Sequence, residues 1–243
     1  MCIRDRCKHL LRGLLENYFN LEYLVKENTK QRAYQFIGTH YYSKLKFYKK
    51  LDNKSKSHSS YKKPFENDKR IGGYPFSQPP QLQSAIKNLE NLFEKEEYRE
   101  IQDELIRLKK EEKVKNPNWF RLFGGPKSIL GLSHRTNLEG MYNTYYRWWS
   151  GHVHGTNIIE GNFSSDSNGK LEVLQIRLPF QAQEITNISI SISLYMIQQY
   201  VNKRLPNHKD LYLNWYARNR EFYKQISGNQ MIVNADKLMN GSS

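Results

Sequence analysis

One short stretch of the sequence, YYRWWSGHVHG at residues 145–155, holds the side chains best suited to chemistry. A histidine can move a proton near neutral pH, and the guanidinium of an arginine can hold a phosphate through two parallel hydrogen bonds. Arg147 and His154 therefore indicate acid–base chemistry on a phosphodiester. Two other interpretations stay open at this point: a metal site at His152 and His154, and a polar stripe that only hydrogen-bonds a neighbouring helix.

The periodicity of residues 136–154 predicts one helix that separates the two histidines. With about 100° per residue, its polar side holds Asn143, Arg147, Ser150 and His154. The apolar side holds Leu138, Met141, Tyr142, Tyr145, Trp148, Trp149 and His152. Alternate residues on a helix diverge, and no cysteine or carboxylate set lies nearby to complete a tetrahedral site. The sequence therefore predicts no metal and no cofactor. Spacing alone favours the structural alternative, in which the polar side bonds another helix.

Hydrophobic periodicity around this helix predicts an all-α protein. The other predicted helices cover residues 8–26, a segment that Thr29 caps, and residues 82–114, 181–204 and 209–227. The turn sequence SSDSNGK between two apolar runs is compatible with a short β-hairpin insertion near residues 160–178.

Composition predicts a single helical domain over residues 7–227. Residues 52–81 are rich in Lys, Ser, Pro and Gly and lack periodicity, which is typical of a disordered, exposed loop. Residues 228–243 are predicted to form a weakly ordered tail. The first six residues, MCIRDR, match what a widely used sequencing-library adapter encodes, so residues 1–6 are predicted to be an artefact.

The charge of the chain favours a polyanionic partner. It has 38 Lys and Arg against 24 Asp and Glu, a net charge of +14, together with 17 tyrosines. Basic surface with aromatic rings suits RNA, although an A/T-rich genome would enrich the same residues. No run of about eighteen apolar residues occurs, which predicts no membrane span. Cys7 is the one cysteine outside the first six residues, which indicates a reducing cytoplasm.

Two short motifs lie in the two halves of the chain. One is Arg-x-x-x-Glu on the first predicted helix, and the other is Tyr-x-x-x-Ser-x-x-x-His at the end of the helix 136–154. They occupy Arg12, Glu16, Tyr146, Ser150 and His154. These motifs resemble a bacterial family of unknown function, as does the stretch RGLLENYFNLEYLVKENTKQRA. That family is related to the HEPN superfamily of helical nucleotide-binding and ribonuclease domains. The resemblance covers roughly residues 8–50 and 115–225.

The resemblance implies a HEPN-like helical bundle and a metal-independent endoribonuclease that acts as a bacterial toxin or in phage defence. Active HEPN enzymes use an arginine and a histidine separated by four to six residues, usually across a homodimer, and assist attack by the 2′-hydroxyl of RNA. Arg147 and His154 fit this spacing. In such a site Ser150 would orient His154, and Glu16 would fix its tautomer or hold Arg147. The polar cleft around them is expected to include Arg12, Asn143 and Tyr146.

One residue departs from the pattern of the active enzymes. Trp148 directly follows the arginine, where active members commonly have a small polar residue. Many superfamily members are also non-catalytic. The alternative function is therefore a module that binds a nucleotide, RNA or a protein such as an antitoxin.

Overall fold

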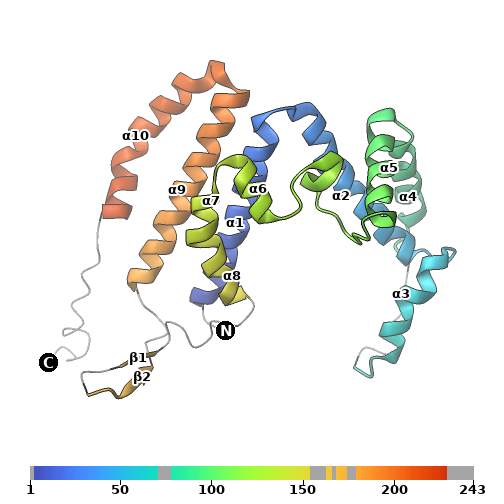
Figure 1. Cartoon of the computed structure of the whole chain (residues 1–243), viewed down its shortest axis with the longest axis horizontal. Helices are drawn as coiled ribbons and strands as arrows, with labels where there is room; N and C mark the ends of the chain where they lie inside the picture. The colour runs from blue at the N-terminus through green and yellow to red at the C-terminus, as the bar shows by residue number, and fades with distance from the viewer. Residues whose placement is uncertain (1–2, 71–77, 154–162, 166–167, 174–178, 229–243) are drawn as a thin grey trace. The chain divides into compact units, whose positions relative to one another are not determined.

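The computed structural model describes residues 3–70, 78–153, 163–165, 168–173 and 179–228 (Figure 1). These residues form helices and one short hairpin, which confirms the all-α prediction. The chain divides into two compact units. Unit 1 comprises Met1–Glu27 and Ser128–Ser243, and unit 2 comprises Asn28–Lys127. Residues 28–127 build hydrophobic clusters of their own. The single domain over residues 7–227 stays a prediction.

Unit 1 is built around α1 (Ile3–Lys26), whose apolar stripe is buried as its helical spacing predicts. The buried side chains of α1 are Leu11, Leu15, Tyr18, Phe19, Tyr23 and Val25. They face α6 (Ile129–Thr136), α8 (Arg147–Val153) and the long α9 (Pro179–Arg204), which lies beside α1 in Figure 1. The last helix, α10 (Lys209–Gly228), follows the 3-10 turn η3 (Pro206–His208) and packs against α9.

The continuous helix predicted over residues 136–154 is wrong. α6 already ends at Thr136, because Asn137 adopts the left-handed conformation with φ 60° and its N–H closes the helix on the carbonyls of Ser133 and His134. The cap of α6 is Ser128, whose hydroxyl accepts the N–H of Gly131 at 3.1 Å.

Two further segments connect α6 to α8. The single turn α7 (Glu139–Met141) is followed by the π-helix η2 (Tyr142–Tyr146), where the N–H of Arg147 donates to the carbonyl of Tyr142. A π-helix places one extra residue in a turn, so every residue after it is rotated relative to a uniform α-helix.

The hairpin predicted near residues 160–178 is present. Strands β1 (Phe163–Ser165) and β2 (Leu171–Val173) pair antiparallel, with Ser164 opposite Glu172. The long segment before α10 is helical even though its ISISIS sequence alternates with the period of a strand, as its length predicts.

Unit 2 packs α2 (Thr29–Leu51) against α4 (Leu82–Phe93) and α5 (Glu96–Lys110), with the short η1 (Trp119–Gly124) beside α2 and α5. One hydrophobic cluster contains Leu45, Leu82, Ile86 and Phe93. A second contains Ile101, Leu105, Leu108 and Leu122. The single helix predicted over residues 82–114 is therefore two helices.

Two local features of unit 2 also differ from the sequence prediction. Asn28, not Thr29, precedes α2 as its cap residue, with φ 49° and no side-chain capping bond. Part of the predicted loop 52–81 forms α3 (Lys56–Asn67), because the hydroxyl of Ser55 caps it and the rings of Tyr61 and Phe65 pack one turn apart. Residues 1–2, 71–77 and 229–243 lie outside the described residues.

Candidate functional site

Three polar side chains from the two motifs meet between α1 and η2. Tyr146 donates its hydroxyl to Glu16 Oε1 at 2.8 Å and accepts from Arg12 Nη2 at 3.0 Å. Arg12 Nε also donates to Glu16 Oε1 at 3.2 Å, because residues four apart share one face of α1. We call this group the motif trio. Both bonds to Glu16 end on Oε1, and Oε2 makes no hydrogen bond to a residue that the structure describes.

The ring of Tyr146 fixes the motif trio in place. Tyr146 is only 7% exposed and packs against Phe19, with 6.2 Å between the ring centroids. The ring of Tyr142 stacks on it at 5.0 Å, and the guanidinium carbon of Arg12 lies 4.9 Å from its centroid. The ring therefore contributes aromatic and cation–π contacts in addition to its two hydrogen bonds.

The electrostatics of the motif trio keep the tyrosine protonated. Burial, and then the hydrogen bond to Glu16, raise the pKa of Tyr146 to about 12. The hydroxyl is therefore a permanent donor near neutral pH and is unsuited to act as a base. Its role in this geometry is to join η2 to α1.

The structure brings together Arg12, Glu16 and Tyr146. It places Asn143 in η2, and Arg147 and Ser150 in α8. Arg147 and Asn143 are exposed and lie four residues apart on one face, whereas Ser150 is half-buried. No ion pair joins Glu16 to Arg147 within the described part of the chain. His154 lies outside the described residues, and nothing is described of the His152 side chain.

The two tryptophans show the effect of the π-helix. A uniform helical wheel turns both toward the apolar side. Trp149 is 4% exposed and stacks on Tyr145, but Trp148 is 55% exposed, so the prediction is wrong for Trp148. The extra residue in η2 rotates the following turn, which brings Tyr146 inward and carries Trp148 outward.

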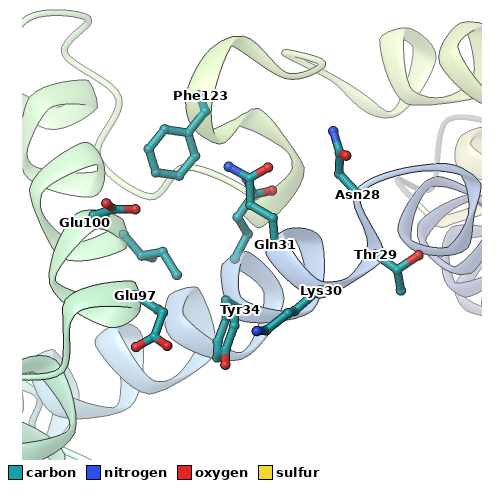
Figure 2. A pocket seen from close by; sticks show the side chains of 10 residues that line it. Asn28, Thr29, Lys30, Gln31, Tyr34, Glu97, Glu100 and Phe123 are labelled. Carbon is teal, nitrogen blue, oxygen red and sulfur yellow. The ribbon is translucent and has the colours of Figure 1, made fainter.

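Unit 2 contains a pocket that the sequence did not reveal. It has a volume of about 450 Å³ and lies between the first turns of α2, the start of α5 and Phe123 of η1 (Figure 2). Its polar lining includes Lys30, Gln35, Glu97 and Glu100. These residues come from segments about seventy positions apart, and none of them forms a recognisable motif.

The described residues offer neither a metal site nor a membrane-spanning helix. They contain no group of three or more His, Cys, Asp or Glu side chains placed to hold a metal ion. None of the described helices combines the length and the apolar character that a bilayer crossing requires.

Comparison with known proteins assigns the chain to a family. No curated protein and no solved structure matches it. A family model described as a family of unknown function, DUF5677, matches residues 3–72 and 79–171, well over half of the chain. The matched residues include both motifs and the π-helix between α7 and α8. The chain therefore belongs to the family of unknown function DUF5677.

Proposed function

We propose that this protein binds RNA at the surface formed by η2 and α8, and cleaves it as a metal-independent endoribonuclease. The observation that supports this most is the motif trio. It anchors the residue directly before Arg147 to α1 through two hydrogen bonds and a buried ring. An anchored turn holds the next residues in a defined orientation, which is what a reactive arginine needs.

Arg147 is well suited to contact a phosphate. Its side chain is exposed and forms no ion pair with any described residue, so its five N–H donors are available to an anion. Trp148, the next residue, exposes more than half of its surface. A cation beside an exposed indole suits single-stranded RNA, because the backbone pairs with the cation and a base stacks on the ring.

The proposed reaction is attack of a ribose 2′-hydroxyl on the neighbouring phosphorus. His154 removes the 2′-hydroxyl proton as the oxygen bonds to phosphorus, and the bond from phosphorus to the 5′-oxygen breaks. The protonated His154, directly or through water, then gives a proton to the leaving 5′-oxygen, which leaves a 2′,3′-cyclic phosphate and a 5′-hydroxyl. Arg147 stabilises the negative charge that develops on the phosphate oxygens. General base catalysis of this kind is worth on the order of a hundredfold or more.

Ser150 and Glu16 are proposed to position this base. Tyr146, Ser150 and His154 follow one another at intervals of four, the spacing of one helix face. Oε2 of Glu16 is bonded by none of the described residues, so it is available to accept an imidazole N–H and fix the tautomer of the ring.

The decisive experiment is an RNA-cleavage assay in EDTA. We expect wild-type protein to cleave single-stranded RNA, and Arg147→Ala and His154→Ala to lose at least a hundredfold in rate. His152→Ala is the matched control, and we expect it to retain activity. Equal rates for wild type and His154→Ala would refute the catalytic proposal, and loss of activity in EDTA would point to a metal instead.

A non-catalytic RNA-binding module is the second candidate function. The exposed Trp148 supports it, because this bulky ring stands where active HEPN enzymes commonly have a small polar residue. Fluorescence anisotropy with a labelled oligonucleotide separates the two candidates. If Trp148→Ala and Arg147→Ala weaken binding while no variant and no wild-type sample cleaves RNA, the module is the correct account.

A further inference from the structure

We propose that the pocket of unit 2 binds a small, flat organic monocation, of the amidinium or guanidinium class. This inference concerns residues of unit 2 alone. It does not depend on the RNA binding and cleavage proposed for unit 1. The pocket volume of about 450 Å³ lies in the range of small-molecule sites.

The first supporting feature is a pair of carboxylates. Glu97 and Glu100 lie three residues apart on one face of α5 and both line the pocket (Figure 2). Neither forms an ion pair with a described residue, although the chain has a large excess of basic groups. In contrast, Glu104 and Glu112 of the same region both bind arginines. Two carboxylates left without a cation favour a positively charged ligand.

The second feature is the side-chain amide of a residue that is buried overall. Gln35 lines the pocket and is only 6% exposed, yet its side chain makes no hydrogen bond to any residue that the structure describes. Side-chain amides of buried residues usually have a hydrogen-bond partner, either a protein group or water. A ligand with N–H groups would supply one, because the amide oxygen of Gln35 accepts them.

The third feature is a set of rings that suits a flat cation. Tyr34 of α2 and Phe123 of η1 line the pocket from different elements (Figure 2). Phe123 adopts a left-handed conformation with φ 54°, and its N–H is held by Glu104 Oε1 at 3.0 Å. A delocalised cation over an aromatic face gains cation–π attraction.

The net charge of the pocket lining favours a ligand with a single positive charge. Besides the two carboxylates, the lining contains one ammonium group, that of Lys30, which leaves one net negative charge. A monocation neutralises this charge, whereas a dication or an anion does not.

Isothermal titration calorimetry on the full chain tests the proposal, with benzamidine as the probe and neutral benzamide as its near-isostere. We expect benzamidine to bind at one site per chain and benzamide to bind at least tenfold more weakly. Glu97→Gln and Glu100→Gln are each expected to weaken benzamidine binding several-fold. Glu96→Gln, an exposed neighbour outside the pocket, is the matched control and should change nothing.

A variant that is expected to tighten benzamidine binding makes the test specific. Lys30→Gln removes the repelling charge and should tighten benzamidine binding several-fold. The proposal is overturned if benzamide binds as tightly as benzamidine, if benzamidine shows no saturable binding in the millimolar range, or if the two pocket glutamates can be replaced without effect. N-acetylarginine amide is titrated in parallel. If it bound more tightly than benzamidine, the pocket would recognise an arginine of a protein and the free small cation would be ruled out.

Discussion

The hydroxyl of Tyr146 donates to a carboxylate and accepts from a guanidinium at the same time. Tyr146→Phe keeps the buried ring and removes both bonds, so the free energy of unfolding should fall by about 1–2 kcal/mol. Chemical denaturation measures this change. The matched control is Tyr142→Phe, whose ring stacks on Tyr146 but whose hydroxyl has no partner among the described residues. Equal stability of Tyr146→Phe and wild type would contradict the anchoring role of the motif trio.

Glu22 of α1 is a second residue whose environment affects the stability of the fold. Its Oε1 is buried without a hydrogen-bond partner, and burial raises the pKa of its carboxyl despite the hydrogen bond from Tyr18 and the charges of Lys203 and Lys26. A carboxyl whose folded pKa lies above its unfolded pKa destabilises the fold at neutral pH, and this penalty disappears as pH falls below the unfolded value.

Glu22→Gln should therefore raise the midpoint of thermal unfolding near pH 7. The gain should shrink as pH falls toward about 3, where the wild-type carboxyl is protonated in both states. Melting curves at several pH values measure it, with the exposed Glu184→Gln as control. A gain that stays constant across this pH range would show that desolvation of the charge is not the cause.

At the scale of elements, periodicity predicted where the helices lie but not how they are interrupted. The spacing of Leu11, Leu15 and Tyr18 identified α1 correctly, because burial of one face requires that spacing. The same reasoning failed after Thr136, since a left-handed Asn137 and a π-helix leave no mark in hydrophobicity.

The two candidate sites also differ in how much of each could be predicted from the sequence. The motifs singled out the three residues of the motif trio, but they did not indicate the hydrogen bonds that join Arg12 and Glu16 to Tyr146. The exposure of Trp148 could not be predicted, since the π-helix η2 that precedes it leaves no mark in the hydrophobic pattern. The pocket of unit 2 depends on how α2, α5 and η1 pack, so no local spacing could indicate it.

Two helical glycines test how closely these elements pack. A Cβ on Gly38 of α2 would lie 3.0 Å from two side-chain carbons of Ile101, whereas a Cβ on Gly13 of α1 would meet nothing within 4 Å. Alanine is favoured over glycine inside a helix by about 0.5–1 kcal/mol. Gly13→Ala should therefore stabilise the protein by about that amount, while Gly38→Ala should give no gain or a loss. Urea denaturation of both variants checks this, and equal gains would show that α2 and α5 are less tightly packed.

At the scale of the whole molecule, the excess positive charge has a local concentration on unit 2. Three lysines of α2 each lie over an aromatic ring: Lys44 over Tyr48 at 5.6 Å, Lys46 over Tyr42 at 5.4 Å and Lys50 over Tyr61 at 5.8 Å. Lys46 and Lys50 lie four residues apart on one side of α2, whereas Lys44 diverges from Lys46. We call Lys46 and Lys50 the lysine–aromatic face. Burial, and then repulsion from Lys109 and Lys50, lower the pKa of Lys46. A polyanion on this face would relieve that repulsion.

If RNA contacts the lysine–aromatic face, replacing Lys46 and Lys50 by glutamine should do more than lower the net charge. Each phosphate contact with a single strand contributes about 0.7 to the slope of log affinity against log salt, so the slope should fall by up to about 1.4. A matched variant with glutamine at the exposed Lys69 and Lys115 loses the same charge and should keep the slope. Filter binding of a labelled RNA between about 50 and 200 mM salt measures both. Identical slopes in the two double variants would mean that RNA responds only to the overall charge of +14 and not to this face.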